Sequence, residues 1–126
     1  MSSPRPIVVH LEEGVLGPGT PGMERRQLFE RGDDWAGWIR TDAGVEGGWH
    51  HHGGHDSYIY VLRGTLTIDF GLGGGESVEA TAGDFIFNPA HLVHRETTSP
   101  DGDVEAFVVR VGEGPQVVNV DGPDET

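Results

Sequence analysis

Histidines gather in two short segments of this chain, and their spacing is that of metal ligands. Four of the seven histidines lie within residues 50–55, and two more are His91 and His94. Successive side chains of a β-strand alternate between its two faces, so His50 and His52 would point to the same side. Two imidazoles aimed at one point can begin a metal site, which further nitrogen or oxygen ligands complete.

The completing ligands must be imidazole nitrogens, carboxylates or water, because the chain contains no cysteine. We predict His94 as the third ligand and Asp56 as the fourth, with His55 as the substitute for Asp56. The site would hold one divalent transition metal ion. Any single histidine among so many glycines is better interpreted as a solvated turn residue, and only the set as a whole favours a metal.

Two residues are candidates for proton transfer beside this metal. Glu96 stands two residues after His94 and shares its face if the segment is a strand. It is predicted as a base near the metal or as an acceptor for a ligand N–H. An ion pair of Glu96 with Arg63 or Arg40 is an equally good interpretation. His55 is the second candidate catalytic residue.

The composition is that of a small all-β domain. At 126 residues the chain fits one domain, and its 21 glycines and 8 prolines indicate many tight turns. Short apolar or alternating runs bounded by turn residues are typical of strands in a sandwich or barrel. The candidate strands are Ile7–Leu11, Arg26–Arg31, Trp35–Arg40, Val45–His52, Ser57–Leu62, Thr65–Phe70, Ser77–Ala80, Asp84–Phe87, Leu92–Thr97, Val104–Val111 and Gln116–Val120. A short helix over Met23–Arg31 is the alternative for the second run.

The expected architecture is a single small antiparallel β-barrel or jelly roll, because closing a sheet on itself removes its exposed edges. We expect this domain to span residues 23–120. A loosely ordered segment with one strand would precede it at residues 1–22, and an acidic tail would follow it at residues 121–126.

The charge of the chain argues against two classes of partner. Eight lysines and arginines stand against 21 aspartates and glutamates, which gives a formal net charge of −13. Such a field repels nucleic acid backbones and anionic membrane surfaces. No apolar run approaches the roughly 20 residues that span a bilayer, and the first residues lack the apolar core of a signal peptide. A cytoplasmic location is therefore expected.

The histidines stand in a pattern that resembles the two motifs of the cupin superfamily, G-x5-H-x-H-x3/4-E-x6-G and G-x5-P-x-G-x2-H-x3-N. The first motif is matched at Gly44, His50, His52 and Gly64. The second is matched over residues 83–89 and at His94. The chain is thus similar to a small single-domain cupin over most of its length. The resemblance implies a β-barrel with one metal ion held by the three histidines.

The carboxylate of the first motif falls in a loop that has one extra residue. Counting forward from His52 places Asp56 at its position, whereas counting back from Gly64 places Ser57 there. Asp56 is preferred because a serine hydroxyl is a poor ligand for a divalent transition metal. A bulge at the preceding glycine pair would absorb the extra residue.

The second motif departs from the family pattern at two positions. His91 stands where the family has glycine, and Thr98 stands where it has asparagine. His91 is predicted as a turn or rim residue, because Pro89 favours a turn there. It is not counted among the ligands.

The resemblance implies a small-molecule substrate and leaves three functions open. We place first a mononuclear dioxygenase acting on a small oxygen-bearing organic molecule, with Fe(II) favoured and Mn, Ni, Co or Zn as alternatives. The second is a redox-neutral metal-dependent isomerase or cyclase. The third is a non-catalytic small-molecule-binding cupin, because cupin-like domains are known in all three roles.

Several aromatic residues could contact either a ligand or a second subunit. Trp38, Trp49 and Tyr60 are candidates for lining the ligand cavity or for a subunit contact. Tyr58, Tyr60 and Leu62 lie on one alternation and are predicted to meet a second copy in a two-fold homodimer. Cupin-like domains often pair in this way.

Overall fold

The computed structural model describes residues 4–124, and β-strands dominate it. The strands are β1 (Val15–Leu16), β2 (Met23–Arg31), β3 (Asp34–Thr41), β4 (His50–His51), β5 (Gly54–Arg63), β6 (Thr65–Phe70), β7 (Glu76–Thr81), β8 (Phe85–Asn88), β9 (His94–Thr98), β10 (Val104–Glu113) and β11 (Val118–Asn119). Two single-turn 3-10 helices complete the described elements, η1 (Leu11–Glu13) and η2 (Leu72–Gly74). The predicted all-β class is confirmed. No helix in residues 4–124 is long and apolar enough to cross a membrane.

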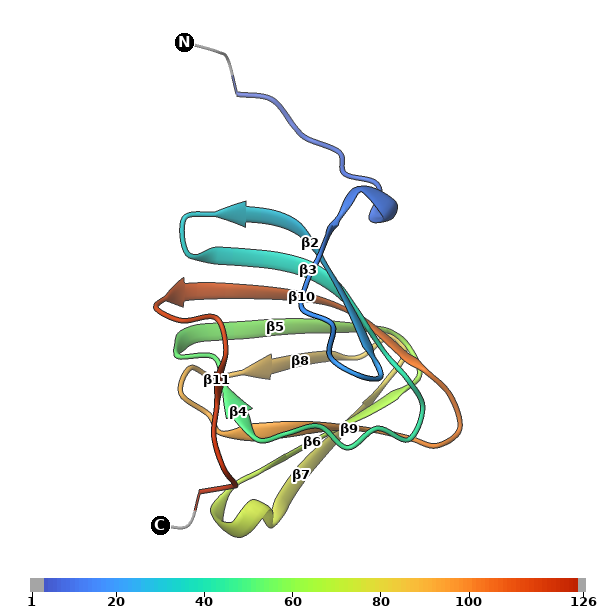
Figure 1. Cartoon of the computed structure of the whole chain (residues 1–126), viewed down its shortest axis with the longest axis vertical. Helices are drawn as coiled ribbons and strands as arrows, with labels where there is room; N and C mark the ends of the chain where they lie inside the picture. The colour runs from blue at the N-terminus through green and yellow to red at the C-terminus, as the bar shows by residue number, and fades with distance from the viewer. Residues whose placement is uncertain (1–3, 125–126) are drawn as a thin grey trace.

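The strands form two antiparallel sheets that face each other (Figure 1). The six-stranded sheet has the order β1-β2-β3-β10-β5-β8, and the five-stranded sheet has the order β11-β4-β9-β6-β7. The prediction was a β-barrel or a jelly roll. No ladder joins the two sheets within the described residues, so the chain adopts a jelly-roll-like sandwich that does not close into a barrel. Three of the four edge strands, β1, β8 and β11, are only 2, 4 and 2 residues long, and the fourth, β7, has 6 residues. Short edge strands limit edge-to-edge pairing without closure.

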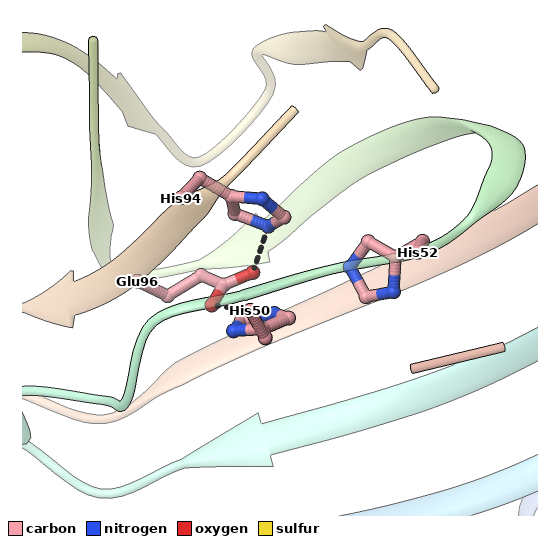
Figure 2. Close-up of side chains that lie close together, drawn as sticks. All are labelled: His50, His52, His94 and Glu96. Carbon is pink, nitrogen blue, oxygen red and sulfur yellow. Dashed lines mark hydrogen bonds and ion pairs between the residues drawn. The ribbon is translucent and has the colours of Figure 1, made fainter. Parts of the chain in front are cut away.

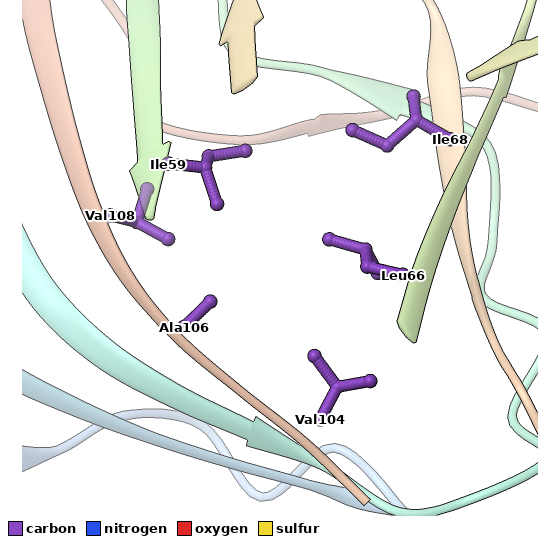
Figure 3. Packing of buried hydrophobic residues seen from close by; sticks show 6 residues of the cluster. All are labelled: Ile59, Leu66, Ile68, Val104, Ala106 and Val108. Carbon is purple, nitrogen blue, oxygen red and sulfur yellow. The ribbon is translucent and has the colours of Figure 1, made fainter. Parts of the chain in front are cut away.

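The core lies between the sheets at one end of the sandwich (Figure 3). Alternation in β5, β6 and β10 directs every second side chain inward, and those positions are apolar at this end. The buried cluster comprises Ile59, Leu66, Ile68, Val104, Ala106 and Val108. Burying a valine, leucine or isoleucine side chain contributes about 1.5–3 kcal/mol. This cluster therefore stabilises the contact between the two sheets.

The outer face of β5 and β8 carries exposed aromatic side chains. Tyr58 and Phe87 stack with their ring centroids 5.4 Å apart, and Tyr60 and Phe85 stack at 4.6 Å. Phe85 is 80% exposed. An apolar face of this kind is what the predicted homodimer would cover, and that assembly stays a prediction.

Two predicted strands disagree with the structure, and the helical alternative for a third run is excluded. The run Ile7–Leu11 is not a strand but irregular chain that leads into η1, and Val8 is 81% exposed. The predicted strand Val45–His52 shrinks to β4 and one isolated bridge, because Gly47 and Gly48 offer no side chain to pack. The helical alternative for Met23–Arg31 fails, since this segment is strand β2 and pairs with β3.

Candidate metal centre

The fold brings His50, His52, His94 and Glu96 together (Figure 2). One ligand atom from each residue lies within 4.8 Å of all the others. His50 in β4 is the direct cross-strand partner of His94 in β9, and His52 follows β4 at once. The two histidines of the first segment therefore share a face, as their spacing predicts.

Backbone carbonyl groups orient all three imidazole rings. The contacts are Nδ1 of His50 to the oxygen of Gly48 at 2.9 Å, Nδ1 of His52 to the oxygen of Gln116 at 2.8 Å, and Nδ1 of His94 to the oxygen of Leu92 at 2.9 Å. A carbonyl oxygen only accepts, so each Nδ1 is assigned the proton and each Nε2 keeps its lone pair. Hydrogen bonds of this type fix the tautomer of metal-binding histidines.

Glu96 gives the group a carboxylate at metal-ligand spacing. Its Oε1 lies 3.1 Å from Nε2 of His94, and its Oε2 lies 3.4 Å from Nε2 of His50. Two ligand atoms that are each about 2.1 Å from one ion are about 3.0 Å apart at a right angle and about 3.4 Å apart at a tetrahedral angle. Without a metal, a proton on Nε2 of His94 makes its contact with Glu96 a hydrogen bond. When that proton is absent, the Nε2 lone pair and the carboxylate oxygen repel each other unless a metal ion lies between them. The donors thus fit a divalent ion.

Charge and burial favour the metal-binding forms of these groups. Burial lowers the pKa of His52 to about 3, and the positive charge of Arg110 acts in the same direction. Burial opposes the ionisation of Glu96, but the imidazoles of His50 and His94 outweigh it and hold its pKa well below the usual range. Near neutral pH the group therefore offers a neutral His52 and an ionised carboxylate.

The same carboxylate has the opposite effect on His50. Burial disfavours the charged imidazole, but hydrogen bonding and attraction to Glu96 outweigh burial and raise the pKa of His50 above its ordinary value. The metal-free group therefore attracts a positive charge to the point where the ligand atoms converge. A proton and a metal ion would compete for that point.

The structure does not bring Asp56 into this group. Its Oδ1 accepts a hydrogen bond from the backbone N–H of Ala90 at 2.9 Å. The inward position of β5 is taken by Ser57, which is only 1% exposed. The register of β5 therefore agrees with counting back from Gly64, and the nearby carboxylate comes from Glu96. Asp56 as a ligand stays a prediction that this geometry does not support.

His55 and His91 hold the loops around the group. His55 is buried, with Nδ1 at 3.0 Å from the oxygen of His52 and Nε2 at 2.7 Å from the oxygen of Asp33. Its ring supports the loop that carries His52, and its role as an acid–base residue stays a prediction. His91 adopts a φ of 65°, and its N–H donates to the oxygen of Gly53. Glycine adopts such a positive φ without strain, which accounts for the glycine of the cupin motif at this position.

The aromatic residues proposed as cavity lining lie elsewhere. Trp38 pairs in register with Phe107, which in turn pairs with Tyr60 on the outer face of the six-stranded sheet. Trp49 packs beneath the guanidinium of Arg95 at 4.7 Å. None of these three predicted residues belongs to the histidine group.

An inward arginine was missed by the sequence analysis. Arg110 is 7% exposed and follows Val104, Ala106 and Val108 on the inner face of β10. Its guanidinium lies over the ring of Trp35 at 4.5 Å. The signal was present, because the same alternation that places the valines inward also places Arg110 there.

An antiparallel two-sheet fold with a partly buried group of three histidines and a glutamate that could hold a metal ion defines a class of small β-sandwich proteins. The family model described as cupin domain matches residues 37–110, more than half of the chain. The chain therefore belongs to the cupin family, as its motifs predict. A comparison with curated proteins gave no match.

Solved structures share this fold. The polyketide cyclase RemF from Streptomyces resistomycificus is 25% identical, with 92% of this chain and 86% of that chain covered and a TM-score of 0.72. Ectoine synthase from P. lautus is 21% identical, with 93% and 91% covered and a TM-score of 0.71. The Fe(II) form of HppE is 13% identical, with 83% and 60% covered and a TM-score of 0.74. At the last two identities the similarity establishes the fold alone.

Proposed function

We propose that this protein is a mononuclear metal-dependent enzyme that acts on a small oxygen-bearing organic molecule. The observation that carries the proposal is the convergence of four donor atoms, from His50, His52, His94 and Glu96, between the two sheets. Four donors leave about two positions of an octahedral ion for substrate. A divalent ion bound there supplies a Lewis acid that polarises a substrate oxygen.

The residues of the chain have separate tasks in this proposal. Three backbone carbonyl groups hold the imidazoles in the tautomer that presents Nε2. Glu96 supplies negative charge, and the oxygen of Glu96 that does not serve as a ligand would accept a proton from bound substrate. The buried setting of His52 and His94 limits access of water to the reacting atoms.

Redox-neutral chemistry, an isomerisation or cyclisation, is the reaction that we place first. It is supported by the likeness to a polyketide cyclase at 25% identity over 92% of this chain. The two remaining positions would fit two oxygens of one substrate, and a redox-neutral reaction needs no position for dioxygen. Dioxygenation is the second candidate, because two positions equally fit one substrate oxygen and one dioxygen molecule.

Metal content is the first test. The full chain is purified without added metal, and its metals are determined by elemental analysis. We expect about one divalent ion per chain in the wild type and little in His52→Ala. His10→Ala is the matched control, because the His10 imidazole is exposed and contacts Glu13, not the histidine group. Fe(II), Mn, Ni, Co and Zn all accept these donors, so the analysis also identifies the metal. A metal-free wild type that also fails to take up any of these ions would refute the proposal.

The reaction class needs a second test. Under nitrogen, the Zn(II)-loaded protein is mixed with 2-oxo acids and 3-oxo acids in deuterated water, and exchange of the α-protons is followed by NMR. Redox-neutral polarisation of a carbonyl accelerates this exchange without dioxygen. Substrate turnover that occurs only with Fe(II), with matching consumption of dioxygen, would favour the dioxygenase. Tight binding without either reaction would favour a binding protein.

A further inference from the structure

Four residues form one row across the inner face of the six-stranded sheet. Trp35 in β3 pairs with Arg110 in β10, Arg110 pairs with Ser57 in β5, and Ser57 pairs with Asn88 in β8. Side chains of directly paired residues point to the same face, with their Cβ atoms about 4.5–5.5 Å apart. Arg110, Ser57 and Asn88 therefore stand side by side on three neighbouring strands.

All three polar members of this row are buried without a complete set of partners. Their exposed fractions are 7% for Arg110, 1% for Ser57 and 4% for Asn88. Arg110 Nε, Ser57 Oγ and Asn88 Nδ2 have no hydrogen-bond partner among residues 4–124. Among the described residues, one other buried side-chain atom lacks a hydrogen-bond partner, Gln116 Oε1. Buried polar groups are nearly always hydrogen-bonded, so a row of three is a functional signal.

The charge of Arg110 makes the signal stronger. Within the described part of the chain no carboxylate lies within ion-pair distance of its guanidinium, whose close contact is the ring of Trp35. Burial lowers the pKa of Arg110 to about 10, so the group is still a cation at neutral pH. Arg95 shows the usual arrangement, since it also lies over a tryptophan but pairs with Asp69 at 2.8 Å. A buried cation without such a partner is costly unless an anion completes it.

The row faces the histidine group across the interior. His50 and His94 belong to the five-stranded sheet, and the row belongs to the six-stranded sheet. His52 is separated by one residue from the start of β5, the strand that carries Ser57, and both side chains are buried. Ser57 also occupies the inward position at which the cupin motif has its carboxylate. The unsatisfied atoms therefore border the same interior space as the candidate ligands.

We propose that Arg110, Ser57 and Asn88 bind the carboxylate group of the substrate while an oxygen at the other end of the substrate reaches the metal. The reach to the metal rests on the proposed function, but the carboxylate site does not. Arginine, serine and the asparagine amide all offer N–H or O–H donors. A carboxylate has two oxygens with about four acceptor positions, and it matches the guanidinium fork in a bidentate pair. The substrate class is thus a small oxo or hydroxy acid.

The test uses two hydroxamates that chelate metal in the same way. Acetohydroxamate ends in a methyl group, and N-hydroxysuccinamate ends in a carboxylate. Their dissociation constants are measured by calorimetry on the Zn(II)-loaded full chain. We expect the carboxylated probe to bind about 10- to 100-fold more tightly than acetohydroxamate, because hydrogen bonds to a charged group contribute binding free energy of that size. Arg110→Met should reduce this ratio to near one without loss of zinc or of acetohydroxamate binding, and Arg110→Lys should keep part of it.

A control variant shows whether the effect is specific to Arg110. Arg63→Met removes an exposed arginine and should leave the ratio unchanged. Thermal unfolding checks the fold of each variant, and if Arg110→Met does not fold, Arg110→Lys and Ser57→Ala decide through a smaller ratio. A ratio near one in the wild type, or an unchanged ratio in all folded variants of the row, would overturn the proposal.

Failure of the metal site is recognised separately. If the chain takes up no zinc, acetohydroxamate will not bind and the proposed function fails. Succinate titrated onto the chain after treatment with EDTA then tests the carboxylate site by itself. Binding that is lost in Arg110→Met would support the site, and binding that is absent or equal in both proteins would refute it.

Discussion

The interior of the sandwich has two ends that are built from the same strands. On β10 the inward residues Val104 and Val108 belong to the apolar cluster, and the next inward residue is Arg110. On β5 the change comes at the neighbouring position, where Ile59 is followed inward by Ser57. A single step of the two-residue alternation therefore separates the apolar core from the polar part of the inner face.

The two ends of the interior divide stability from binding. The apolar end contains the buried aliphatic cluster and stabilises the contact between the sheets. The polar end contains the candidate metal ligands and, among residues 4–124, all of the buried side-chain atoms without a partner. Such atoms reduce the stability of the free protein and are retained where a ligand completes them. The predictions below test this division.

The largest effect is expected at the apolar end. Ile68→Ala should lower the free energy of unfolding by about 2–5 kcal/mol, because it leaves a cavity beside β10. Its cross-strand partner Val78 is 46% exposed, so Val78→Ala is the matched control and should cost far less. The measurement is denaturant unfolding of the metal-free protein. Equal losses in the two variants would mean that the apolar end is not the stabilising region.

The second prediction concerns the carboxylate of the metal group. Glu96→Gln keeps the shape but removes the charge, and it should weaken metal affinity at least about tenfold, since even outer-shell losses cost 10- to 100-fold. Asp56→Asn is the control, because Asp56 accepts from Ala90 and lies outside the group. Competition with a chromophoric chelator measures both affinities. If Asp56→Asn weakened metal affinity and Glu96→Gln did not, the metal ligand would be Asp56 and not Glu96.

A smaller effect of opposite sign is expected at Arg110. Replacing this unpaired buried cation by methionine should raise the free energy of unfolding of the metal-free protein by about 1 kcal/mol, or a midpoint shift of about 3–5 °C. Arg95→Met removes a paired arginine on the outer side and should lower stability slightly. Calorimetry of the ligand-free proteins checks both signs. A large loss in Arg110→Met would identify this arginine as a structural residue instead.

The smallest effect is expected at Ser57. Ser57→Ala removes a buried hydroxyl that has no partner within the described residues, so the free energy of unfolding should change by less than about 1 kcal/mol. Thr98→Ala makes the matched comparison, since the Thr98 hydroxyl donates to the oxygen of Asp42 at 2.6 Å. Thr98→Ala should lower the free energy of unfolding by more than Ser57→Ala does, because it removes this hydrogen bond. The reverse order would contradict the assignment of unsatisfied groups to the polar end.

Strong alternation made much of the fold predictable. The run Thr65–Phe70 is strand β6 with the same bounds, and the runs that became β5 and β10 extend by only a few residues. The prediction failed at Ile7–Leu11, where apolar side chains meet no sheet edge. The choice between a closed barrel and an open jelly roll did not follow from the sequence, because it depends on contacts between distant edge strands that local patterns do not encode.

The candidate site was predictable to the extent that it follows motif spacing. The three histidines and the face of Glu96 follow from alternation, and the structure brings them together. The choice between Asp56 and Ser57 did not follow, because a slip of one residue in a strand exchanges its two faces. The row of Arg110 and Ser57 required the pairing of β10 with β5, which only the folded chain supplies.

The shortness of β4 determines how a bound ion would be exchanged. This strand has two residues and is joined to β9 by one residue pair and to β11 by two. Segments with so few ladder hydrogen bonds open at a free energy well below that of global unfolding. Opening of β4 would withdraw His50 and His52 together while His94 stays between its neighbours on β9. Ion exchange would then follow a local opening that amide hydrogen exchange can detect, and the sandwich need not unfold to load or release its metal.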